Sequence, residues 1–121
     1  MKKVQFSERP SLVANEGQGV LICFDVEEVE VVQEAMGNGE EEVRMPMYEA
    51  YAVRVEHPVT RSRMVDAIVT SAYPSDVMQA IINNHLLGDG DSEHEAEFAA
   101  MQEWRVLAKR TADDVLAVIH G

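Results

Sequence analysis

The segment of this sequence that looks most like a chemical site is GDGDSEHEAE, residues 88–97, where five acidic side chains surround His94. One chemistry to test is calcium binding by a loop of the EF-hand type. Such a loop has oxygen ligands at alternate positions, a glycine at the sixth position and a glutamate at the twelfth. With Asp89 as the first position, His94 is sixth and Ala100 twelfth. The segment therefore lacks both the glycine and the final glutamate of a calcium loop. Weak cation binding stays as an alternative interpretation.

A helix start explains the same residues better. Ser92 is followed three residues later by Glu95, the spacing of a capping box, in which the two side chains satisfy free backbone N–H groups. Asp91, Glu93 and Glu97 add negative charge where the dipole of a helix favours it. We therefore predict that Ser92 caps a helix and that this segment holds no metal ion.

Other residues capable of chemistry are dispersed. His57, His85, His94 and His120 show neither the i, i+4 spacing nor the accompanying CxxC pairs of zinc sites. The motifs GxSxG, GxGxxG and GKS are absent from the sequence. We expect no catalytic residue, no cofactor-binding residue and no metal ligand. An enzyme or small-ligand domain with a pocket built from dispersed residues is the alternative.

Charge narrows the choice of partners. The chain of 121 residues has 22 acidic and 10 basic side chains, a formal net charge of −12. That charge repels phosphate backbones and anionic lipids, so we expect neither nucleic acid nor membrane as a partner.

Cys23 lies in the apolar run GVLICF and indicates a buried, reduced thiol. MKK is followed by no apolar stretch of a secretion signal, so we expect a cytoplasmic protein.

One stretch concentrates this charge: between Asp25 and Glu42 there are eight acids and no base. It is either the solvated face of a hairpin or a docking surface for a basic partner, including a surface that inhibits a nucleic-acid-binding protein. Arg105, Lys109 and Arg110 form a basic band near the C-terminus. The band can satisfy the free carbonyls at the end of the helix. Alternatively, it can meet the acidic stretch of a second copy, so a homodimer is also an expected partner arrangement.

The elements that position these residues fall into two parts of a single domain, 1–121. Residues 1–57 alternate as β-strands do, with apolar positions at Val20, Ile22, Phe24, Val26, Val29, Val31, Met47, Tyr51, Val53 and Val55. The alternation changes phase after Val26, which predicts a bulge at Glu27 and Glu28. Asn38-Gly39 favours a type I′ hairpin turn. A short third strand is expected in KKVQFS, and Pro46 is expected on an outward edge or at an irregularity.

Residues 58–121 have the three- and four-residue spacing of helices. Thr60 is the expected N-cap of the first helix, and Ser75 that of a second helix, which ends at Gly88. The third helix is the longest, with Trp104 on its packed side. The sequence predicts an α+β fold in which a bulged antiparallel hairpin of two or three strands packs against two short helices and one long helix.

The helical part resembles a known group of proteins. TRSRMVDAIVTSAYPSD and EFAAMQEWRVLAKRTADDV, within residues 58–115, resemble segments of small prophage or mobile-element proteins, including the C-terminal helices of phage tail-assembly accessory proteins. The resemblance implies an accessory or assembly role and transfers no functional residue. We therefore expect a non-enzymatic interaction or assembly protein whose partner is another protein or a second copy.

Overall fold

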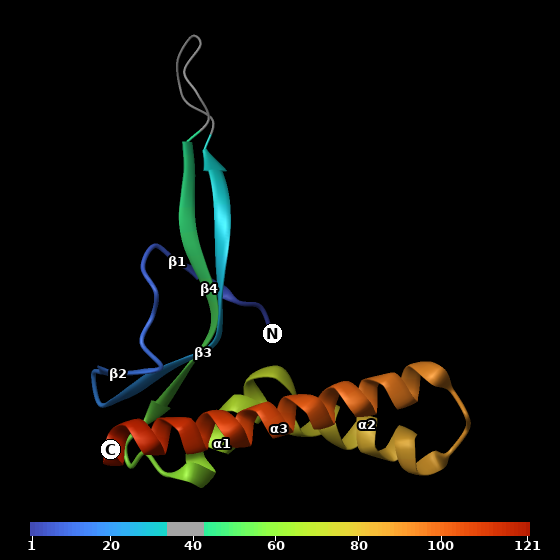
Figure 1. Cartoon of the computed structure of the whole chain (residues 1–121). Helices are drawn as coiled ribbons and strands as arrows, with labels where there is room; N and C mark the ends of the chain where they lie inside the picture. Colours follow the sequence, from blue (N-terminus) through green and yellow to red (C-terminus); the bar gives the residue numbers. More distant parts are fainter. Residues whose placement is uncertain (34–42) are drawn as a thin grey trace.

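The computed structural model describes residues 1–33 and 43–121. Within them the chain forms an antiparallel sheet and three helices (Figure 1), which confirms the α+β class. The strands are β1 (Val4–Phe6), β2 (Val13–Glu16), β3 (Gly19–Gln33) and β4 (Val43–Glu56), and the helices are α1 (Arg61–Ala72), α2 (Ser75–Leu87) and α3 (Ser92–His120). The strand order is β1-β4-β3-β2. The predicted Asn38-Gly39 turn lies outside the described residues.

Four strands are present where two or three were expected. The predicted third strand is β1, which pairs with the middle of β4. The additional strand is β2, which pairs with the beginning of β3 across a turn at Gly17 and Gln18. Its sequence, VANE, has one large apolar residue, and three of its four side chains are exposed. Backbone pairing with β3 therefore defines this strand more than side-chain burial does.

The bulge lies two residues before the predicted position at Glu27 and Glu28. Phe24 pairs with Tyr51 and Glu27 pairs with Glu49, so Asp25 and Val26 together face a single residue of β4. Asp25 has a φ angle of 53°, in the left-handed region that aspartate tolerates better than branched residues. The prediction was wrong because a change of phase locates the extra residue only approximately.

The core lies on one face of the inner halves of β3 and β4. Helices α1 and α3 cover that face. The buried cluster consists of Val20, Ile22, Phe24, Val53 and Val55 from the strands, Met64, Ile68 and Val69 from α1, and Ala108, Ala112 and Val115 from α3. The predicted alternation is thus confirmed for the inner halves of both strands. Small side chains at Ala108 and Ala112 allow α3 to approach its neighbours closely.

Helix α2 lies alongside α3 rather than on the sheet. The two helices run side by side away from the base of the ribbon (Figure 1), and each has a buried apolar side chain, Ile81 in α2 and Met101 in α3. The Thr60 side chain accepts the N–H of Arg63, and Gly88 ends α2 with a φ angle of 63°, as predicted. The predicted Ser75 cap was wrong: Pro74 is the N-cap, and Ser75 is the first residue of α2. Pro74 already fixes an extended backbone before the helix.

Candidate interaction surface

The acidic segment 88–97 joins α2 to α3. Asp91, not Ser92, is the N-cap of α3: its side chain accepts the N–H of Glu93 at 2.8 Å. Asp89 accepts the N–H of Asp91 at 3.0 Å, and its other carboxylate oxygen lies 3.0 Å from Nδ1 of His94. The Asp91 N–H chiefly, and His94 further, hold the pKa of the Asp89 carboxyl below its usual range. The prediction of a cap was correct in kind and wrong in residue.

The same segment has a geometry that a cation could use. Asp89, Asp91 and His94 each bring one ligand atom within 4.8 Å of the others. However, both carboxylates already accept backbone N–H groups, and Asp89 also accepts from the ring of His94. Nearby, His85 stacks on Phe98 with ring centroids 3.7 Å apart. These contacts hold the turn between α2 and α3, which accounts for the cluster without a ligand.

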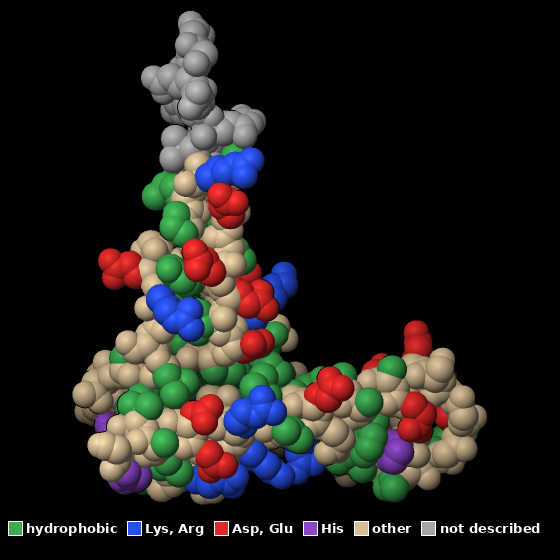
Figure 2. All heavy atoms as spheres, in the orientation of Figure 1, with side chains coloured by type: hydrophobic (Ala, Val, Ile, Leu, Met, Phe, Trp, Pro, Cys, Tyr) green, Lys and Arg blue, Asp and Glu red, His purple; other side chains and the backbone are tan. Residues whose placement is uncertain are grey.

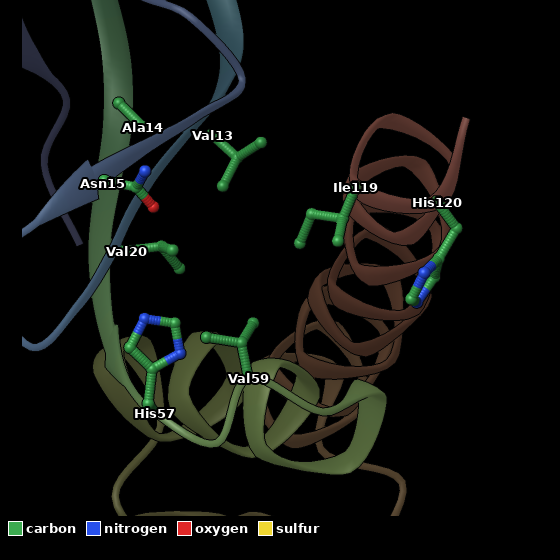
Figure 3. A pocket seen from close by; sticks show the side chains of 8 residues that line it. All are labelled: Val13, Ala14, Asn15, Val20, His57, Val59, Ile119 and His120. Atoms are coloured by element: carbon green, nitrogen blue, oxygen red, sulfur yellow. The ribbon is translucent and has the colours of Figure 1, made fainter.

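A cleft of about 410 Å³ opens between β2 and the end of α3 (Figure 3). Its lining consists of Val13, Ala14, Asn15, Val20, His57, Val59, Ile119 and His120. The two imidazoles lie at opposite ends of the cleft, and the lining contains no carboxylate, serine or cysteine. A histidine that activates a side-chain nucleophile needs that nucleophile within hydrogen-bond reach, and this lining offers neither serine nor cysteine. The sequence gives no sign of this grouping, because His57 and His120 are far apart in the chain.

Cys23 is buried, as predicted. Burial first, and the negative charge of Glu16 second, raise the pKa of its thiol. A thiol with a raised pKa forms little of the reactive thiolate at neutral pH. Cys23 therefore behaves as a packing residue of the sheet.

The most distinctive surface is on the outer half of the β3–β4 ribbon, residues 27–33 and 43–49, here called the arm. Val29 pairs with Met47 and Val31 pairs with Met45, so four apolar side chains form one stripe. The stripe continues the face that is buried in the inner half, yet none of its residues belongs to the buried core. Met45 is 46% exposed. Both hydrophobic and acidic side chains reach the surface along the arm (Figure 2).

The opposite face of the arm has two acidic side chains, Glu28 and Glu30, together with Arg44 and with Val32, which is 48% exposed. Glu28 and Glu30 are exposed there and, with Val29 and Pro46, line a shallow hollow. Arg44 is 3.7 Å from Glu30, whereas Glu27, on the stripe side, is held by Lys3 at 2.9 Å. The described part of the acidic stretch thus combines an apolar face with an acidic face. The sequence indicated both properties, but not that the helices leave this half of the ribbon uncovered.

Comparisons with protein-family models, with curated proteins and with solved structures give no match for this chain. In residues 1–33 and 43–121, no helix is both long enough and apolar enough to cross a membrane.

Proposed function

We propose that this protein is a non-enzymatic interaction or assembly protein that binds a protein partner through the arm. The observation that supports this most directly is the apolar stripe of Val29, Val31, Met45 and Met47, which lies outside the buried core. Met45 is exposed, and the other three side chains are half-buried. An isolated two-stranded ribbon is marginally stable in water, and an apolar patch at the surface often marks a binding site. A partner that covers the stripe would both gain affinity and stabilise the arm.

The charge of the chain defines the kind of partner. With a net charge of −12, the protein is expected to avoid nucleic acid and anionic membranes. The single cysteine, Cys23, favours action in the cytoplasm. The accessory or assembly role implied by the resemblance to prophage proteins agrees with an arm that reaches beyond the core. The proposal assigns binding to the arm and no reaction to the dispersed histidines.

A second candidate is favoured by the acidic face of the arm. The carboxylates of Glu28 and Glu30 are regularly spaced negative charges, as are the phosphates of a nucleic acid. They could therefore occupy the basic site of a nucleic-acid-binding protein. Self-association is the other outcome to distinguish, since Lys109 and Arg110 are exposed on α3 and could face a second arm. Each of these candidates places a different chain against the arm.

Site-specific photo-crosslinking in the native host tests the proposal. A benzophenone amino acid is placed at Met45 in the stripe or, as a control, at Val106, which is 55% exposed on α3. We expect one discrete covalent product from Met45 and none from Val106. A product of two identical chains identifies a homodimer, and a nucleic-acid-binding partner supports the inhibitor. No product from Met45, or the same products from both positions, would refute binding by the arm.

A further inference from the structure

Pro46 reveals which backbone groups of the arm face outward. It pairs with Glu30, and because proline has no N–H, this pair is one in which the backbone groups point away from the partner strand. This orientation agrees with the prediction that Pro46 lies on an outward edge or at an irregularity. Outward and inward residues alternate along a strand, so Glu28, Glu30 and Val32 present their N–H and C=O groups on the outer edge of β3.

The inner half of β3 supports this assignment. There the N–H of Cys23 donates to the carbonyl of Leu12 at 2.9 Å, on the outer side of β3. Outward residues therefore have odd numbers before the bulge. The bulge inserts one residue into β3, so the residues that point outward have even numbers after the bulge. The pairing of Glu30 with Pro46 leads independently to the same result. The two observations give the same orientation.

The two edges of the arm differ. On β4, Pro46 offers no N–H, and β1 covers Tyr48, Glu49 and Ala50. On β3, the pairing with β2 ends at Ile22, and no strand in the described part of the chain pairs with the outer edge from Glu27 to Gln33. Natural sheets commonly protect open edges with proline, bulges or charged side chains, most often lysine. This part of β3 has no proline or lysine; its charges are Glu27, Glu28 and Glu30, which discourage an acidic strand and leave the edge open to a basic one. The β3 edge is thus the one that can accept another strand.

The side chains beside this edge specify the occupant. Glu28 and Glu30 lie on one face, and Val29 and Val31 lie on the other. A strand added here would place basic side chains beside the glutamates and apolar side chains beside the stripe. A second copy fits poorly: two antiparallel β3 edges centred on Val29 would set Glu28 of each chain opposite Glu30 of the other, and opposed like charges destabilise a sheet.

We infer that the outer edge of β3, from Glu27 to Gln33, is a strand-addition site for a segment of another protein that alternates basic and apolar residues. Main-chain hydrogen bonds to Glu28, Glu30 and Val32 would supply affinity, and the alternation would supply specificity. This inference rests on the proposed function, because it names the kind of partner that the arm binds.

Two synthetic peptides of identical composition test the inference. One has the sequence Lys-Val-Lys-Val-Lys-Val-Lys, and its isomer has all four lysines before the three valines. With the full-length protein, we expect the alternating peptide to bind about tenfold more tightly than the isomer. In NMR spectra, amide exchange at Glu28, Glu30 and Val32 should slow only with the alternating peptide. Equal affinities, no binding of the alternating peptide, or shifts spread over all acidic surfaces would refute strand addition.

Two variants separate backbone from charge. Val32→Pro removes an outward N–H and changes no charge, so it should weaken binding of the alternating peptide about tenfold. Glu30→Gln keeps the N–H, so it should weaken binding less and reduce its salt dependence. Thermal unfolding checks that Val32→Pro is folded, and the amide exchange of the unmodified protein needs no variant. If Met45 crosslinks to a partner but the two peptides bind equally, the proposed function stands and strand addition fails.

Discussion

The inner and outer halves of the β3–β4 ribbon have the same alternating pattern but different surroundings. In the inner half, Ile22 is 0% exposed and Val53 is 5% exposed, beneath α1 and α3. In the outer half, the same face continues as the stripe of the arm, where Met45 is 46% exposed. The helical layer covers this face in the inner half and ends before the outer half. An alternating pattern therefore identifies a face that must be covered, but not whether the same chain covers it.

The largest effect is expected where the two halves meet. The Trp104 ring is 4.9 Å from that of Tyr51 and 5.8 Å from that of Phe24, and its N–H donates to the carbonyl of Ile68 at 2.9 Å. Trp104→Ala should lower the free energy of unfolding by about 3–5 kcal/mol in urea denaturation. Trp104→Phe keeps a ring and should lose less.

Fluorescence provides an independent check on this junction, because Trp104 is the sole tryptophan of the chain. Its native emission should be shifted to the blue relative to the unfolded protein. A loss below about 1 kcal/mol on truncation, together with emission like that of free tryptophan, would mean that the junction is not packed by this ring.

A matched pair of substitutions tests the comparison itself. Val53→Ala removes two buried methyl groups from the inner half and should cost about 2 kcal/mol in the same denaturation assay. Val31→Ala makes the same change in the arm and should cost about 0.5 kcal/mol or less. For crosslinking from Met45 the order should reverse, with Val31→Ala the more damaging variant. Equal losses of stability would show that the arm is covered by its own chain.

Much of the fold could be predicted because the spacing of apolar residues shows which face of a strand or helix is buried. The alternation at Val20, Ile22 and Phe24 identified the core face, and Thr60 and Gly88 marked helix ends through specific backbone needs. Strand β2 escaped prediction because VANE shows no clear alternation and is defined by pairing with β3. The spacing of apolar residues reveals buried faces, whereas β2 is held by backbone hydrogen bonds to β3 and buries few side chains.

The candidate site was predictable only in part. The acidic stretch and the apolar alternation of β3 are both visible in the sequence, but the exposure of the stripe depends on where α1 and α3 end. The bulge was misplaced because two local facts decide it: the positive φ of Asp25, and Lys3 bridging Asp25 and Glu27. The orientation of the open edge required the observed pairing of Pro46 with Glu30.

The N-terminal end of α3, which lies away from the sheet, provides a test with a smaller expected effect. Asp91 caps α3 beyond the sheet, and Ser92 makes no capping bond. Asp91→Ala should therefore cost about 1 kcal/mol, within the usual range for a lost N-cap, while Ser92→Ala should cost little. Thermal unfolding of both variants measures the difference. A larger loss from Ser92→Ala would restore the cap predicted from the sequence.

The smallest effect is expected from ion pairs in the two regions. Beneath the inner half, Arg61 of α1 donates from Nε to Asp113 of α3 at 2.7 Å. This hydrogen bond first, and the charge of Arg61 second, lower the pKa of the Asp113 carboxyl. A carboxyl whose pKa is lower in the folded state stabilises the protein above its unfolded-state pKa of about 4. That contribution disappears as the pH falls through the lower, folded-state value.

Asp113→Asn should therefore lower the midpoint of thermal unfolding slightly at pH 7, and the difference from the unmodified protein should disappear at acidic pH. Both ion pairs are exposed, but Arg61 is hydrogen-bonded to Asp113 at 2.7 Å, whereas Arg44 of the arm lies 3.7 Å from Glu30. Exposed pairs of this kind contribute little, so Arg44→Gln should leave the midpoint unchanged at every pH. If Arg44→Gln were as damaging as Asp113→Asn, the arm would be stabilised by its own ion pair. The contrast between a packed inner half and an outer half that depends on a partner would then fail.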